Sequence, residues 1–211
     1  DFCLSRGLGD VYKRQLVLGT IIATATFVLF YLMTVFALSW GTTGLGYTRK
    51  EFLILQLFAV VFFALTIPVS ALLADKYGRR ITMILVSIAI VLFGFLIAPM
   101  FVANDPIGVT LFLSIGLALM GMTYGPLGTM LSELFPTEIR YTGVSLTFNL
   151  GGIVGASLAP YAATWLATNY GLHYVGYYLS GATLLTLLAL FMVGKQKSIT
   201  ETPLTPSGSK S

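Results

Sequence analysis

Six uncharged apolar segments, separated by short polar turns, dominate this chain of 211 residues. No Asp, Glu, Lys or Arg occurs inside any of them. The hydrocarbon core of a bilayer is ~30 Å thick and takes ~20 helical residues to cross, so each segment is long enough to span it. The sequence therefore predicts an all-α membrane protein with one domain over 16–194 and six transmembrane helices, at about 16–39, 52–74, 81–102, 107–131, 144–167 and 173–194.

Composition agrees with a chain whose solvent is largely lipid. Hydrophobic residues make up 56% and charged residues only 9%, whereas soluble domains carry about 25% charged residues. The net charge of +4 does not indicate nucleic-acid binding, because the basic residues are scattered over short loops and form no stripe. The chain has a single cysteine and a single histidine. We therefore expect no disulfide framework, no metal site, no cofactor and no enzymatic cluster at the membrane face.

The two ends of the chain differ from its middle. Residues 1–15, DFCLSRGLGDVYKRQ, are polar, lack a signal-peptide core and resemble translated sequencing-adapter read-through. We expect a non-native leader there, so that the natural chain would begin upstream; the alternative is a short cytoplasmic lead-in. Residues 195–211 are rich in Ser, Thr and Pro, and we expect a disordered cytoplasmic tail.

Lys and Arg are distributed unequally between the two sets of turns. One set, with the tail, carries Lys76, Arg79, Arg80, Arg140, Lys195 and Lys197, and the other carries only Arg49 and Lys50. Basic residues accumulate in cytoplasmic loops, so the first set and both chain ends are predicted to be cytoplasmic. The chain is predicted to be a multi-pass protein of the bacterial inner membrane.

Small residues and prolines distinguish two of the predicted helices. Gly121, Gly125 and Pro126 lie in 107–131, and Gly151, Gly155 and Pro160 lie in 144–167. Such residues let helices approach closely in lipid, and they also suit bent, moving helices; both meanings stay open here. Segments 81–102 and 173–194 are nearly pure aliphatic and aromatic, which suits positions facing lipid.

Two charged turns carry a family resemblance. ALLADKYGRR, at 71–80, resembles the GxLaDrxGRR turn of the major facilitator superfamily, with Ala71 in place of the leading glycine. SELFPTEIRYTG, at 132–143, resembles the hinge between the tenth and eleventh helices of the same superfamily. The fuller string GPLGTMLSELFPTEIRYTG, with ASLAPYAATWLA further on, is most similar to the metabolite:proton symporter family, which includes transporters for shikimate, 2-oxoglutarate and proline betaine. The resemblance covers roughly residues 20–195.

The resemblance implies that this chain is the C-terminal half of a twelve-helix transporter. The six spans would be helices seven to twelve, arranged as two three-helix units of inverted topology. The implied partners are the lipid bilayer, a missing N-terminal six-helix half, a small-molecule substrate and protons.

The resemblance also implies a gating role for the charges of the two turns. They are Asp75, Arg79, Arg80, Glu133 and Arg140. The turns would meet in the outward-open state and separate when the inside opens. We expect Glu133 to contact one arginine of the Arg79/Arg80 pair, and we favour the gating role for Glu133 and Arg80. The alternative is that these charges set topology and are bathed in water, where an ion pair contributes ~0–1 kcal/mol.

The absence of ionisable residues inside the six segments limits what they can bind. Proton relays use such groups, so a protonatable site would lie in the missing half. The neutral candidates for a substrate cavity are Tyr31, Thr34, Gln56, Thr123, Tyr124 and Asn149. For Gln56 and Asn149, hydrogen bonding between helices is an equally good interpretation.

Three functions follow as hypotheses. The first is a secondary active transporter that moves a small polar metabolite or organic anion with protons by alternating access. The second is a sugar-porter-like or drug-efflux member of the same superfamily. The third, from another class, is a six-helix membrane scaffold or complex subunit that transports nothing.

Overall fold

The structure is a computed structural model that describes residues 2–103 and 105–200, with side chains for 12–103 and 105–193. Its elements are all helical within those ranges. They are α1 (Phe2–Tyr31), the π-helical turn η1 (Leu32–Phe36), α2 (Ala37–Thr43), α3 (Arg49–Tyr77), α4 (Arg79–Met100), α5 (Pro106–Ser132), α6 (Arg140–Asn169) and α7 (Leu172–Thr200).

The described residues contain six helical stretches that are long and apolar enough to cross a membrane. They run over Tyr12–Thr43, Arg49–Tyr77, Arg79–Met100, Pro106–Ser132, Arg140–Asn169 and Leu172–Val193. The prediction of six transmembrane helices is confirmed, although most of the helices extend beyond the predicted apolar segments. A helix satisfies its own backbone hydrogen bonds, so it continues past the apolar core into the polar interface.

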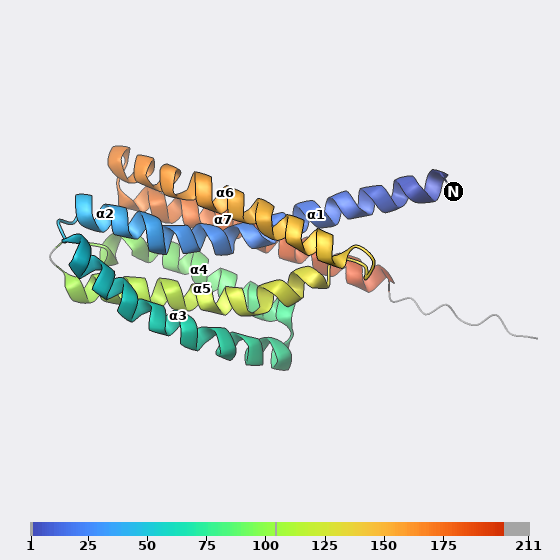
Figure 1. Cartoon of the computed structure of the whole chain (residues 1–211), viewed down its shortest axis with the longest axis horizontal. Helices are drawn as coiled ribbons and strands as arrows, with labels where there is room; N and C mark the ends of the chain where they lie inside the picture. Colours follow the sequence, from blue (N-terminus) through green and yellow to red (C-terminus); the bar gives the residue numbers. More distant parts are fainter. Residues whose placement is uncertain (1, 104, 201–211) are drawn as a thin grey trace, which may run out of the picture.

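Both ends of the described chain are helical where the sequence suggested a separate leader and tail. α1 runs without a break from Phe2 through the segment 1–15, and α7 continues six residues beyond Gly194 to Thr200. The rest of the expected disordered tail, 201–211, lies outside the described residues. Figure 1 shows the start of α1, the end of α7, and the α3–α4 and α5–α6 turns at one end of the bundle.

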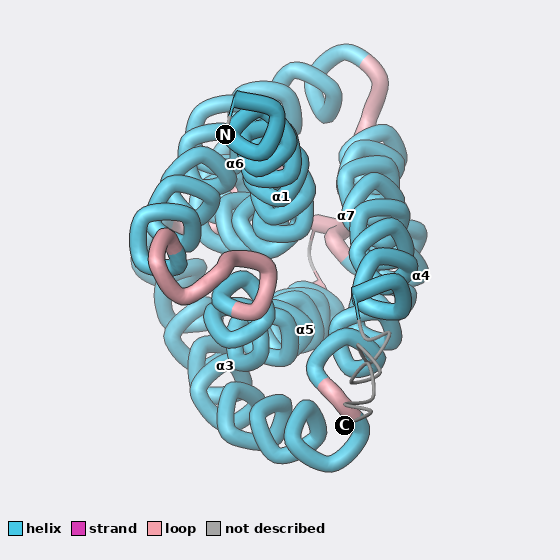
Figure 2. Tube along the Cα trace, turned by 90° about the vertical axis from the view of Figure 1, so that its right-hand side faces the viewer, coloured by secondary structure: helices cyan, strands magenta, loops and turns pink. Residues whose placement is uncertain are grey.

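Three helix pairs form the bundle. α3 packs most extensively on α5, α4 on α7, and α1 on α6, and Figure 2 shows the three pairs side by side. The next most extensive contacts, α1 with α7 and α4 with α5, connect the three pairs. These five contacts are symmetric. If α1, α3 and α4 are exchanged with α5, α6 and α7 in that order, the same five pairs result. Two three-helix units of inverted topology are expected to show this symmetry.

Glycine faces hold α3 close to α5. A Cβ added at Gly121 would meet Thr66, and one added at Gly125 would meet Ser70. The two hydroxyls cross the same interface, since Thr66 Oγ1 donates to the Ala118 carbonyl at 3.0 Å and Ser70 Oγ to the Gly121 carbonyl at 3.3 Å. Hydroxyls that bond backbone across closely packed helices are a common source of association in lipid.

Glycines also allow α1 and α6 to pack closely. A Cβ at Gly151 would lie 2.8 Å from the Cβ of Ala23, and one at Gly155 would lie 2.9 Å from the main-chain carbon of Phe27. α6 therefore has no room for a side chain at either glycine. Close packing, one of the two meanings left open by the sequence, is present at this interface.

The α4–α7 pair has a close contact that its apolar composition did not predict. Gly94 and Gly176 face each other, and Ser180 Oγ donates to the Val91 carbonyl at 3.0 Å. Within the most apolar stretch of each helix, 44% of the residues of α4 and 50% of those of α7 are buried against other helices. The corresponding values are 11% for α3 and 28% for α6. α4 and α7 expose leucines and phenylalanines as expected, but α3 and α6 are the least covered helices. Composition could not reveal this, because lipid and neighbouring helices are equally apolar.

Prolines do not end the helices that contain them. α5 runs through the buried Pro126, and α6 runs through the half-buried Pro160. Proline removes one backbone donor, and packed neighbours in a membrane bundle allow the helix to continue past the gap.

Candidate functional site

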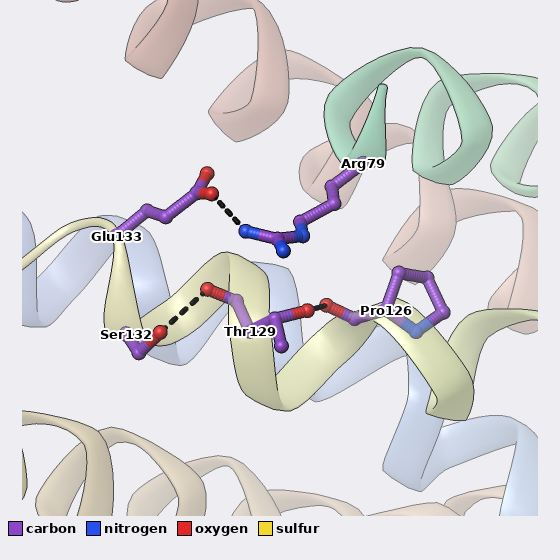
Figure 3. Close-up of polar contacts among 5 residues, drawn as sticks. All are labelled: Arg79, Pro126, Thr129, Ser132 and Glu133. Carbon is purple, nitrogen blue, oxygen red and sulfur yellow. Dashed lines mark hydrogen bonds and ion pairs between the residues drawn. The ribbon is translucent and has the colours of Figure 1, made fainter. Parts of the chain in front are cut away.

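An ion pair joins the two charged turns at one end of the bundle. Arg79, the first residue of α4, donates through Nη1 to Oε1 of Glu133, which directly follows α5 (Figure 3). The side chains are 36% and 44% exposed, so the pair is only partly shielded from solvent. Pairs as exposed as this one contribute ~0–1 kcal/mol. Its value therefore lies in linking two turns 54 residues apart rather than in global stability.

Local backbone chemistry places both partners. Gly78 has φ +93°, a conformation that side chains rarely allow, and it lets α4 begin directly after α3 ends. On the other side, the backbone N–H of Glu133 bonds to the Thr129 carbonyl at 3.2 Å and completes the last turn of α5. Hydroxyls of Thr129 and Ser132 bond back to their own helix, as Figure 3 also shows.

Arg80 has a different partner from the one expected. Either arginine was a predicted partner of Glu133, and Arg80 was favoured for the gating role. The Nε of Arg80 instead donates to the Leu190 carbonyl of α7 at 2.9 Å, and its Nη2 donates to the Phe191 carbonyl at 3.4 Å. Adjacent residues on a helix point about 100° apart, so only one of the two arginines faces α5. Arg79 takes that position, and Arg80 fastens α4 to α7.

The other two predicted gating charges lie close to this end but outside the ion pair. Asp75 lines a hollow of about 450 Å³ together with Arg79, Arg80 and Glu133. Asp75 makes no salt bridge to any described side chain. Arg140, the first residue of α6, donates through Nε to the Phe135 carbonyl at 3.4 Å and borders a separate pocket.

A pocket of about 520 Å³ lies toward the opposite end, between the first two spans. Among its lining residues are Thr34, Leu38, Ser39, Thr42, Arg49 and Gln56. Two of the predicted cavity residues, Thr34 and Gln56, thus lie in one place. We name it the Arg49 pocket.

Gln56 joins the wall of this pocket to the π-helical turn. Its Nε2 donates to the carbonyls of Met33 and Thr34, both at 2.9 Å. The backbone N–H of Ala37 bonds to the Leu32 carbonyl, five residues back, which is the wide spacing of a π-helix. Such turns occur frequently at functional sites. Hydrogen bonding between helices, one of the two interpretations of Gln56, is present.

The loop before α3 fixes the position of Arg49. Thr48 Oγ1 accepts from the Glu51 backbone N–H at 3.3 Å, and the Glu51 carboxylate accepts from the Thr48 backbone N–H at 3.0 Å, a reciprocal capping box. Tyr47 packs on Phe52 with ring centroids 6.1 Å apart. Burial, with the Asp105 and Glu51 carboxylates, raises the pKa of the Tyr47 hydroxyl, which therefore stays neutral.

Another pocket, of about 600 Å³, lies beside the α5–α6 turn. It is lined by Ser132, Thr137, Arg140, Tyr141, Ser145 and Asn149, among others. Asn149 donates through Nδ2 to the Ser145 carbonyl of its own helix at 2.7 Å. The predicted cavity residue Asn149 therefore lies at the opposite end from Thr34 and Gln56. We name this the Arg140 pocket.

The remaining predicted cavity residues lie in neither pocket. Thr123 is only 2% exposed, and its hydroxyl donates to the Met120 carbonyl at 2.8 Å, so it lines no open cavity in this conformation. Tyr124 is 41% exposed and contacts the rings of Phe63 and Phe148. Tyr31 is half-buried with its ring against that of Phe30.

Sequence reasoning missed Arg49, Ser39 and Thr42 as pocket residues. Arg49 was counted only as a topology charge, although its spacing of seven residues from Gln56 places the two on one helix face. That spacing could have identified Arg49 as a pocket residue. Nothing in the sequence could have predicted the π-helical turn, since Leu32–Phe36 is an ordinary apolar run. Within the described residues, no group of His, Cys, Asp and Glu could hold a metal ion.

By its fold and its charged turns, this chain is a polytopic α-helical membrane protein with two inverted three-helix units. The family model described as "Major Facilitator Superfamily" matches residues 16–210. The chain belongs to the major facilitator superfamily, and the six described spans fit one half of that fold.

Curated relatives agree with this assignment. The inner membrane metabolite transport protein YhjE of Escherichia coli is 49% identical over 186 residues, which cover 86% of this chain and 42% of that protein. The shikimate transporter of Escherichia coli is 31% identical, covering 80% and 39%. The citrate-proton symporter of Klebsiella pneumoniae is 27% identical, covering 88% and 42%. The chain spans less than half the length of these relatives, which are transporters and not enzymes.

Proposed function

We propose that the whole protein, meaning this chain with any further residues of its natural sequence, is a secondary active transporter. It moves a small polar metabolite or organic anion together with protons across the bacterial inner membrane. Membership of the superfamily supports transport, and the names of the relatives support a metabolite as cargo. Proton coupling is supported by one relative, which is named as a proton symporter.

The observation that carries the mechanism is the Arg79–Glu133 ion pair between the two charged turns. We propose that the turns are cytoplasmic, because Lys76, Arg79, Arg80 and Arg140 gather at their end of the bundle. In alternating access, one end of the bundle closes while the other opens. An ion pair between the turns favours the arrangement in which the cytoplasmic end is closed, and its loss favours the opposite arrangement.

Uptake into proteoliposomes tests this function. The purified whole protein is reconstituted, and accumulation of labelled shikimate, citrate, proline or betaine is followed with and without an imposed pH gradient, acid outside. We expect at least one of these solutes to accumulate above its external concentration only when the gradient is present. Protein-free liposomes are the control. Equilibration that ignores the gradient would argue against coupling to protons, and no uptake of any solute would argue against transport of these metabolites.

A further inference from the structure

The Arg49 pocket combines a cation with a set of oriented neutral groups. Arg49 is the first residue of α3 and Gln56 lies seven residues further along, two turns or about 10 Å deeper on the same face. The volume of about 520 Å³ falls within the range of small-molecule sites, about 300–1,000 Å³. The only salt bridge among the described side chains is that between Arg79 and Glu133, so the Arg49 guanidinium is not neutralised by a described carboxylate.

The hydrogen-bonding groups of the pocket include one charged donor and several acceptors. Both Nε2 hydrogens of Gln56 are used on backbone carbonyls, so its Oε1 faces away from them as an acceptor. Thr34 and Thr42 each donate to their own helix, to the Phe30 carbonyl at 2.7 Å and the Leu38 carbonyl at 3.0 Å. Their hydroxyls therefore offer lone pairs. The donor that stands beside them is the guanidinium of Arg49.

This arrangement complements one class of molecule. A carboxylate matches the guanidinium, with which it can form two parallel hydrogen bonds. Hydroxyl or ammonium groups further along the same molecule match the oxygens of Gln56, Thr34 and Thr42. An apolar acid would leave those acceptors without partners, and a neutral polyol would leave the cation without one.

The Arg140 pocket repeats the arrangement in the other three-helix unit. Arg140 is the first residue of α6 as Arg49 is of α3, and α3 and α6 are the second spans of their units. Each pocket also holds a carboxamide inside the helix, Gln56 in one and Asn149 in the other. Because the units are inverted, the two arginines stand at opposite ends of the bundle.

We propose that the Arg49 pocket binds the carboxylate of a small hydroxy- or amino-carboxylic acid, with Arg49 as the charge partner and Gln56, Thr34 and Thr42 as acceptors for its hydroxyl or ammonium groups. This inference rests on the proposed transport of a metabolite and narrows its chemical class. The Arg140 pocket is the equivalent site at the other membrane face.

Protection of a single cysteine from alkylation tests the site without requiring transport. Val35 lines the pocket and is exposed, so Val35→Cys, with Cys3 and any other native cysteine replaced, gives the reporter. The whole protein in detergent is treated with a maleimide in the presence of D-gluconate, L-malate or L-proline. D-glucitol, which lacks the carboxylate, and hexanoate, which lacks the hydroxyls, are the comparison compounds. We expect at least one of the three acids to protect at a concentration tenfold or more below both comparison compounds.

Substitutions of Arg49 test whether its side chain is responsible for the protection of the Val35→Cys reporter. Arg49→Gln should raise the half-protecting concentration of the acid at least tenfold, and Arg49→Lys should restore part of it. Lys50→Gln is the matched control, because Lys50 is the adjacent exposed cation and does not line the pocket. The Thr48–Glu51 capping box remains in all three variants, and monodisperse elution confirms folding.

Each result bears on the inference separately from the proposed function. Protection by no acid, equal protection by D-glucitol, or equal loss in Arg49→Gln and Lys50→Gln would overturn the site. Acid-selective protection that depends on Arg49 would support it even if proteoliposomes showed no proton-coupled uptake. If the protein takes up substrate but shows no acid-selective protection, the proposed transport function would stand and the Arg49 pocket would not be its binding site.

Discussion

Arg79 and Glu133 are 54 residues apart in the chain, yet their side chains pair across the ends of α4 and α5. Two features bring them together: a positive-φ glycine that starts α4 at once, and the end of α5 at Ser132. Because each partner belongs to a different three-helix unit, the pair joins the two units at one end of the bundle. Relative movement of the units at that end requires the pair to separate.

The first prediction concerns orientation. A cysteine at Thr43, next to the α2–α3 loop, should react with an impermeant maleimide in intact cells. A cysteine at Thr137, in the α5–α6 turn, should react only after permeabilisation, because its end of the bundle carries most of the basic residues. Both positions are exposed. Labelling of Thr137→Cys alone in intact cells would invert the proposed orientation.

The second prediction concerns the α3–α5 interface. Gly125→Ala places a methyl group against Ser70 and 2.9 Å from the Ile67 carbonyl, where neither helix can give way cheaply. We expect the unfolding free energy in detergent to fall by about 1–3 kcal/mol, the usual effect of overpacking. Gly128→Ala is the control, since a methyl group there meets nothing within 4 Å and gains helix propensity. Equal stability of the two variants would mean that the helices do not pack this closely.

The third prediction concerns Gln56. Gln56→Leu removes both hydrogen bonds to the π-helical turn, and bonds of this kind contribute on average about 0.6 kcal/mol each in a membrane protein. We expect a small loss of stability and faster hydrogen exchange confined to the turn and its neighbours. Exchange about three turns earlier in α1, around Thr20, should stay unchanged. Unaltered exchange across Leu32–Phe36 would show that the amide does not hold the turn.

The sequence predicted the number and class of the helices well, because the length and apolar character of a segment decide whether it spans a bilayer. Thr34 and Gln56, two of the six predicted cavity residues, line the same pocket. The sequence could not choose between Arg79 and Arg80, since that choice depends on how far α4 is rotated about its axis. It could not foresee the contact of Gly94 with Gly176, because in lipid an apolar face may meet tails or another helix at similar cost.

The most direct test of the central claim is a double-mutant cycle on the Arg79–Glu133 pair in the whole protein. Reactivity of Val35→Cys, at the opposite end of the bundle, reports the population in which that end is open. Glu133→Gln and Arg79→Gln should each lower this population by a similar factor. The double variant should lower it no further, giving a coupling of up to about 1 kcal/mol, or about fivefold, for a half-exposed pair. Arg80→Gln combined with Glu133→Gln should instead be additive, because Arg80 bonds to α7. Coupling within error of zero for Arg79, or coupling that appears only with Arg80, would contradict the proposed role of the pair.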